Sequence, residues 1–434
     1  MNIVKVIRVI NIGGFGLIEE VQCNDGKKYA RKTFHPSSAF LSDRELCERL
    51  KTRFVREVRT QKMLPQEFFI PVIYEDLRSN NPWFLMPLAD DVYTNEIARS
   101  KNESRNPDGL ADILNSLEFI HSKDLIHRDL KPQNILLHEG TWKLADFGLI
   151  SQDKDILSQS ITTSNHAYGT AMYCAPEQTT DFRRVTPQAD IYSFGAILHD
   201  IFTDGKRVPY SELTGTGEIG IIIERCTKNK KEHRFKNIKT LRDKLLYILS
   251  KDVTKNITTD AAEWIEALKT LDNWDADKIE NFVFFLKRNE DVWDTVFYEL
   301  NIEILDFFYK ENSELFNEFA LMYFSWVSKK GFNFDYCDVI IGYIYNIYQK
   351  TSDLEVKSKA VIAAAELGRS HNRWYVMKYV VRMSDHKIHD NLAFRISLEL
   401  ELDKRNKLNF IGCVEGINNF IHVYHPTIEN ALKD

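Results

Sequence analysis

The chain has 434 residues, which is long for a single domain, so two domains are expected. Hydrophobic residues make up 44% of the sequence and charged residues 28%, a balance that is typical of folded globular proteins and excludes general disorder. The net charge of −6 gives no reason to expect a nucleic-acid partner, and no apolar run approaches the length of a membrane span.

The first predicted elements are strands. The β-branched and apolar N-terminal residues, together with the hairpin signal Asp25-Gly26, predict three of them. They are expected at 3–10, 17–22 and 27–34. A long helix over 43–64, closed by a proline, and a strand over 83–88 follow. Together these elements are expected to form a first lobe over about residues 1–88.

The pattern becomes mainly helical from about residue 108, interrupted by two short strand-like pieces at 135–137 and 142–144. Because strands come first and helices follow, the sequence predicts a two-lobed α+β domain. The second lobe is expected over about 89–250, so the whole domain covers residues 1–250.

Residues 251–434 differ from the rest. Apolar residues recur at helical spacing and Pro426 is the only proline, which predicts an all-α domain of nine or ten helices. Pairs such as 356–368 and 374–383 are separated by short polar turns, so a solenoid-like array or an irregular bundle is expected. Helix caps are expected at Thr258, Thr259, Asp275, Ser313, Asp353, His371 and Asn372.

Charge is unevenly distributed along the chain. Residues 251–320 contain 17 Asp or Glu against 7 Lys or Arg. A solvated helix surface is the simpler explanation of this acidic stretch, and a docking face for a basic partner is the alternative.

The strongest chemical signal is one short segment. Residues 126–134 read IHRDLKPQN and residues 146–148 read DFG. Transfer of a phosphoryl group needs positioning and charge neutralisation more than covalent help from the protein. A carboxylate must meet the substrate hydroxyl, and Asp129 fits that role. The oxygens of Asn134 and Asp146 suit magnesium, which prefers hard ligands.

A lone Asp is usually a turn or cap residue, but the string HRDLKPxN followed closely by DFG is highly specific. On these residues the segment 1–250 resembles the eukaryotic-type protein kinase superfamily. The resemblance implies the two-lobed kinase fold, ATP and Mg²⁺ as cofactors, protein substrates, and Lys131 as a second catalytic residue that offsets charge on the moving phosphate. It does not extend to residues 251–434.

The glycine-rich turn at 11–16 reads NIGGFG and lies between two predicted strands, which excludes a dinucleotide-binding fold. Asn11 stands where the family usually has its first glycine, so altered closure over the nucleotide is expected. The residues that the resemblance places over the phosphates are Ile12, Gly13, Gly14, Phe15 and Gly16.

The resemblance assigns Lys32 to the α- and β-phosphates and pairs it with Glu57 of the long helix. Each would otherwise be read as a solvated surface charge. The segment beginning at Met86 resembles the hinge that holds adenine, with the carbonyl of Pro87 and the N–H of Ala89 as hydrogen-bonding groups. The apolar residues expected to sandwich the base are Ile18, Ala30 and Leu136.

Residues 169–177 read GTAMYCAPE and resemble the end of an activation segment. By the same resemblance Glu177 would pair with Arg234, and Asp190 would anchor the backbone of the catalytic loop. These are structural roles that set geometry.

Lys131 and Thr170 are the residues that the resemblance associates with serine/threonine kinases. Arg128, which precedes the catalytic Asp, often pairs with a phosphate on the activation segment. Autophosphorylation near Thr162 or Thr163 is therefore expected. A flexible loop rich in Ser and Thr is the plain alternative.

Two other classes of function stay open from the sequence. One is an ATP-binding pseudokinase scaffold, and the other is an interaction protein in which the helical domain binds a partner or signal. The six cysteines lie apart without CxxC spacing, which argues against a zinc site or a disulfide framework. A reducing cytoplasm is the expected location.

Overall fold

The computed structural model describes residues 1–13, 16–36, 43–146, 171–180, 185–250, 259–270 and 274–433. The chain divides into two compact units, residues 1–248 and residues 249–434. Each unit has its own core and is described by itself.

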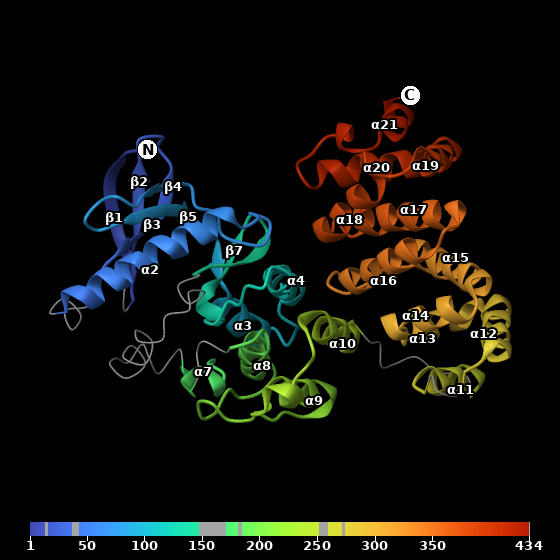
Figure 1. Ribbon diagram of the computed structural model, residues 1–434, viewed down its shortest axis with the longest axis horizontal. Helices are drawn as coiled ribbons and strands as arrows, with labels where there is room; N and C mark the ends of the chain where they lie inside the picture. Colours follow the sequence, from blue (N-terminus) through green and yellow to red (C-terminus); the bar gives the residue numbers. More distant parts are fainter. Residues whose placement is uncertain are drawn as a thin grey trace. The chain divides into compact units, whose positions relative to one another are not determined.

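The first unit begins with a five-stranded antiparallel sheet of order β1-β2-β3-β5-β4 (Figure 1). The strands are β1 (Ile3–Ile12), β2 (Gly16–Cys23), β3 (Lys28–Phe34), β4 (Tyr74–Asp76) and β5 (Trp83–Pro87). β3 lies at the centre of the sheet, so its side chains are held by a neighbouring strand on each side. The sequence predicted four of these strands and missed β4, which is three residues long.

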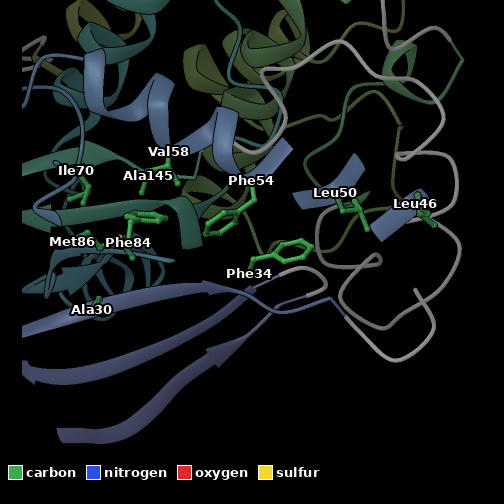
Figure 2. Packing of buried hydrophobic residues seen from close by; sticks show 10 residues of the cluster. All are labelled: Ala30, Phe34, Leu46, Leu50, Phe54, Val58, Ile70, Phe84, Met86 and Ala145. Carbon is green, nitrogen blue, oxygen red and sulfur yellow. The ribbon is translucent and has the colours of Figure 1, made fainter. Parts of the chain in front are cut away.

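Helix α2 (Arg44–Met63) begins where Asp43 caps it, accepting a hydrogen bond from the backbone N–H of Leu46 at 3.0 Å. The helix packs its apolar side chains against the sheet (Figure 2). Phe54 contacts Phe34 of β3 and Phe84 of β5, with ring centroids 5.9 and 6.0 Å apart. This packing fixes the height and rotation of α2 above the central strands.

The second lobe of this unit is mainly helical and carries a small sheet of order β6-β7-β8. Its strands are β6 (Asp91–Val92), β7 (Ile135–His138) and β8 (Thr141–Leu144). Its helices are α3 (Tyr93–Asn102), α4 (Leu110–His121), α7 (Glu177–Thr180), α8 (Gln188–Phe202), α9 (Gly217–Cys226) and α10 (Ile238–Ser250). The sequence predicted β7 and β8, which frame the candidate catalytic residues, and missed β6 and α3.

Eleven α-helices lie in the described part of the second unit, one more than the upper sequence estimate. They are α11 (Thr259–Leu268), α12 (Ala276–Arg288), α13 (Trp293–Phe297), α14 (Ile302–Glu311), α15 (Ser313–Lys329), α16 (Cys337–Lys350), α17 (Leu354–Ser370), α18 (Trp374–Ser384), α19 (Asp390–Leu402), α20 (Lys404–Glu415) and α21 (Pro426–Lys433).

These helices stack in chain order and form two rows (Figure 1). One row runs α14, α16, α18 and α20, and the other runs α13, α15, α17, α19 and α21, with each helix contacting the next in its row. Contact with near neighbours in two parallel rows is the arrangement of a solenoid. The solenoid-like alternative of the sequence prediction therefore describes this unit.

The predicted caps at Asp275 and Asp353 are present, because each side chain accepts backbone N–H bonds at the start of its helix. His371 ends α17 as predicted. At α15 the prediction was wrong by one residue, since Asn312 caps the helix and Ser313 is its first residue. Thr258 lies outside the described residues.

In the parts of the chain that the structure describes, no helix has the length and apolar character needed to cross a membrane.

Candidate active site

Lys32, on the central strand β3, contacts two carboxylates. Its Nζ is 2.7 Å from Oε1 of Glu57 on α2 and 3.1 Å from Oδ1 of Asp146, just beyond β8. The side chain of Glu57 is buried and that of Lys32 is partly buried, whereas that of Asp146 is 38% exposed. The predicted Lys32–Glu57 ion pair is therefore present, and a third charged group that still reaches solvent meets the same lysine.

Burial and mutual charge shift the protonation of these three groups. Burial raises the pKa of Glu57 to about 7, and the charge of Lys32 offsets part of that effect. Burial acts to lower the pKa of Lys32, but the carboxylates of Asp146 and Glu57 outweigh it and raise the pKa overall. Burial also acts to raise the pKa of Asp146, but Lys32 and Lys131 hold it well below its usual range. The lysine and Asp146 are thus both charged at neutral pH.

The candidate catalytic loop precedes β7. Nζ of Lys131 lies 2.9 Å from Oδ2 of Asp129. The amide nitrogen of Asn134 donates to the backbone carbonyl of Asp129 at 2.8 Å and to its Oδ2 at 3.1 Å. Because both bonds use the amide nitrogen, the amide oxygen is the atom that Asn134 can offer to a cation. The three predicted residues are therefore close together.

Arg128 is held on both sides of its backbone. It has a φ of +66°, a left-handed conformation that is costly for a non-glycine residue. Its N–H donates to Oδ1 of Asp190 at 2.8 Å, and its carbonyl accepts from Nε2 of Gln178 at 2.9 Å. Oδ2 of Asp190 also accepts from the N–H of His127 at 2.9 Å. The anchoring contact predicted for Asp190 is present, whereas Gln178 was not predicted.

Asp146 also has a left-handed backbone, with a φ of +64°. The residue before it, Ala145, is fixed by two hydrogen bonds. Its N–H donates to the carbonyl of Asn134 at 2.9 Å, and its carbonyl lies 3.1 Å from Nε2 of His127. The catalytic loop therefore holds the backbone that presents the Asp146 carboxylate to Lys32.

The glycine turn approaches the lysine closely. The N–H of Gly13 donates to the carbonyl of Gly16 at 2.8 Å, and Ile12, paired with Leu17, ends β1 with an exposed side chain. A Cβ atom on Gly16 would lie 3.4 Å from Cε of Lys32. The lack of a side chain at Gly16 therefore lets β2 pass close to the Lys32 side chain without crowding it.

The residues expected to hold an adenine share one apolar cluster. Ala30 and Met86, which pair across β3 and β5, are buried in it (Figure 2). The partly buried Ile18 and Leu136 pack against this cluster. Pro87 ends β5 and Ala89 follows two residues later. The N–H of Asp90 then donates to the carbonyl of Leu137 at 2.8 Å, which ties this hinge segment to β7.

Glu177 and Arg234 form a bidentate ion pair, as predicted. The two guanidinium nitrogens of Arg234 lie 2.7 and 2.8 Å from the two carboxylate oxygens of Glu177. The Arg234 side chain is fully buried and donates further to backbone carbonyls, including that of Lys228 at 2.7 Å. Gln178 follows Glu177 directly, so the same short helix carries the ion pair and the contact to Arg128.

Several predicted site residues lie outside the described part of the chain, and their roles remain predictions. They are Gly14, Phe15, Phe147, Gly148, Thr162, Thr163 and Thr170.

Several known proteins are similar in sequence to part of this chain. The serine/threonine-protein kinase AfsK of Streptomyces griseus is 30% identical over 209 residues, which are 48% of this chain and 24% of that protein. The serine/threonine-protein kinase PknL of Mycobacterium tuberculosis is 30% identical over 182 residues, 41% of this chain and 43% of that protein. The chain thus spans a quarter to less than half of the length of these relatives.

A solved structure described as the apo form of PpkA-294 has a TM-score of 0.47 at 19% identity, over 56% of this chain and 96% of that one. The family model described as "Protein kinase domain" matches residues 4–268, which is more than half of the chain and includes every residue of the site above. The chain therefore belongs to the protein kinase domain family.

Proposed function

We propose that the chain is an active serine/threonine protein kinase that transfers the γ-phosphoryl group of ATP to protein hydroxyls with the help of magnesium. The observation that carries this proposal is the convergence of Lys32, Asp129, Asn134 and Asp146. They come from three separate stretches of the sequence, and hydrogen bonds and ion pairs link them. A scaffold that had lost catalysis would not need this set intact.

The residues present fit a magnesium–nucleotide complex. The carboxylate of Asp146 and the amide oxygen of Asn134 are hard oxygen donors of the kind that Mg²⁺ takes. Lys32 would hold the α- and β-phosphates next to Gly16, which has no side chain to obstruct them. The apolar cluster with Ala30 and Met86 would hold the adenine. When bound, magnesium would neutralise charge on the phosphates.

The chain's own residues then have distinct tasks. Asp129 orients the acceptor hydroxyl and takes up its proton. Lys131, whose pKa is raised overall because Asp129 and Asp146 outweigh the effect of burial, supplies a positive charge next to the moving phosphate. Glu57 holds Lys32 in place.

The activation segment and the second unit are assigned roles that go with this activity. Autophosphorylation at Thr162 or Thr163 would add a phosphate that can pair with the guanidinium of the buried Arg128 and order the segment. The solenoid-like unit would recruit a protein substrate or a signal, since stacked helical rows present extended surfaces. Its many aromatic side chains are mostly core, as shown by the buried Phe297, Phe319 and Trp326.

A phosphate-incorporation assay with radiolabelled ATP tests the activity. The purified protein would be compared with its Asp129→Asn variant on proteins of a cell lysate, with magnesium and with EDTA. We expect the variant to lose at least about a hundredfold in rate, as for removal of a positioned general base. Asp108→Asn, whose side chain is 79% exposed, is the matched control and should retain full activity.

Phosphopeptide mapping of the same samples reports on the activation segment. We expect phosphate between residues 158 and 164 in the wild type and none there in Asp129→Asn. If the wild type binds Mg-nucleotide but incorporates no phosphate, the proposed kinase activity is wrong and the chain is a pseudokinase. Equal rates for the wild type and Asp129→Asn would show that the candidate catalytic loop takes no part in the reaction.

A further inference from the structure

A buried glutamine interrupts the apolar face of α2. Gln61 lies four residues after Glu57, so the two side chains occupy the same face of the helix. Gln61 is 2% exposed and is therefore as buried as the apolar Phe54 and Val58 of the same helix. A buried amide is costly unless it is hydrogen-bonded, and an apolar residue would suit this face better. The position therefore calls for a reason beyond packing.

The amide of Gln61 reaches a backbone atom outside the helix. Its Nε2 donates to the carbonyl of Ile70 at 2.7 Å, and this bond is fully buried. The N–H of Ile70 in turn donates to the carbonyl of Leu144 at 3.1 Å, and the N–H of Leu144 donates to the carbonyl of Phe68 at 3.0 Å. A continuous hydrogen-bonded path thus runs from α2 through residues 68–70 to the end of β8.

The end of β8 carries the candidate magnesium ligand. Leu144 and Ala145 are buried, and Asp146 follows them directly. Glu57 and Asp146 both contact Nζ of Lys32, and they come from different elements, Glu57 from α2 and Asp146 from beyond β8. The path through Gln61 is therefore a second link between the two elements whose carboxylates must be correctly spaced around the lysine.

We propose that Gln61 is a positioning residue, which sets the distance between α2 and the Asp146 backbone and thereby the geometry around Lys32. This inference rests on the proposed phosphotransfer for its effect on rate, but the mechanical link itself exists without nucleotide. Loss of the bond would weaken the attachment of α2 to residues 68–70, although the apolar packing of the helix would remain. A misplacement of even 1 Å at such a site can cost up to about a hundredfold in rate.

Hydrogen exchange of the nucleotide-free protein tests the link directly. Gln61→Met keeps the length of the side chain and removes its donor. We expect the amides of Ile70 and Leu144 to exchange at least about tenfold faster, since a buried carbonyl loses its partner and the path loosens. A role confined to the local helix would instead speed exchange in the last turn of α2 and leave Leu144 unchanged, which would overturn the proposal.

Steady-state kinetics provides the second readout. We expect Gln61→Met to lower kcat/KM about tenfold, with most of the loss in kcat. In a Glu57→Gln background the same change should have a much smaller effect, because the helix no longer holds Lys32. Additive effects in the two backgrounds would contradict positioning through α2.

A matched control is available on the same helix. Leu50 is 3% exposed and packs in the same apolar cluster, without a place on the hydrogen-bonded path. Leu50→Val should lower the thermal stability of the protein while Leu144 exchanges as in the wild type. If both variants speed exchange at Leu144 equally, general loosening of the lobe explains the result and the proposal fails.

The outcome is separable from that of the proposed function. If the wild type proves inactive, hydrogen exchange still decides whether Gln61 links the two elements. If Gln61→Met does not fold, the link can be tested by native-state hydrogen exchange of the wild type at low concentrations of denaturant. The amides of α2 and of Leu144 should then open as one unit with the same denaturant dependence, and separate opening would refute the link.

Discussion

Asp190 and Gln178 hold the peptide backbone of Arg128 from opposite sides. One accepts from its N–H and the other donates to its carbonyl, and both side chains are buried. The left-handed φ of Arg128 is therefore imposed by two side chains that are distant in sequence. The catalytic Asp129 follows directly, so its position depends on this pair.

The charge on Asp190 should stabilise the fold over a wide pH range. Burial acts to raise its pKa, but the hydrogen bond and charge of His121, with further help from His127 and the N–H of Arg128, hold the pKa below its usual value. A carboxyl whose folded pKa is depressed contributes its full stability above the unfolded pKa of about 3.9, and loses it as the pH falls through the folded pKa.

We therefore expect Asp190→Asn to lower the free energy of unfolding by about 3 kcal/mol at pH 7, as for loss of a buried hydrogen-bonded charge. The difference from the wild type should not decrease between pH 8 and 5, and it should narrow below about pH 4. Urea denaturation at each pH measures it, with Asp108→Asn as the exposed control. A difference that already narrows between pH 8 and 6 would implicate a group other than Asp190.

The roles of residues that belong to a sequence motif could be predicted from the sequence. The roles of side chains that hydrogen-bond to the backbone could not. Lys32, Glu57 and Asp146 were found because their spacing follows a family pattern, and the structure brings them together. Gln178 and Gln61 have backbone carbonyls as partners. A backbone carbonyl is present at every residue, so such a contact leaves no signal in the partner's sequence.

At the scale of elements, the start of α4 shows how one missing side chain positions a strand. Gly109 precedes the helix with a φ of +83°, and a Cβ atom there would lie 2.0 Å from Cδ1 of Trp142 on β8. Trp142 in turn packs edge-on against Tyr93 of α3, with ring centroids 4.9 Å apart. The glycine therefore lets α3, α4 and β8 meet beside the catalytic loop.

We expect Gly109→Ala to lower the free energy of unfolding by about 3 kcal/mol, the sum of a left-handed backbone penalty and an overpacked core. Gly140 provides the control, because its φ is +73° and no atom lies within 4 Å of the added Cβ. Gly140→Ala should cost about 1–2 kcal/mol through the backbone alone. If urea denaturation gives equal losses of unfolding free energy for the two variants, Trp142 moves aside for the added methyl group at little cost.

The elements missed by the sequence reading are the short ones and those without a side-chain cap. β4 and β6 have three and two residues, too few to show an alternating pattern. α3 begins at Tyr93, and Val92 before it makes no capping hydrogen bond with its side chain, so the start of this helix carries no signal in the sequence. α2 was predicted closely because Asp43 caps it and a proline follows it.

At the scale of the whole chain, the two units have separate apolar cores and different architectures. The first combines a sheet lobe with a helical lobe, and the second is a two-row array of helices. The kinase family model extends to residue 268, through α11, although α11 belongs to the second compact unit. The residues proposed to hold ATP and magnesium all lie in the first unit.

We expect calorimetry of the full chain to resolve two unfolding transitions, since each unit has its own core. Mg-ADP at about a hundred times its Kd should stabilise the first unit by about 2.7 kcal/mol and leave the other transition in place. For a unit of this size the shift in Tm is roughly 5–10 °C. EDTA should abolish most of the shift, and so should Asp146→Asn, which removes a proposed metal ligand. If both transitions move together, or if only one is seen, nucleotide binding is coupled to the helical unit and the two cores do not unfold independently.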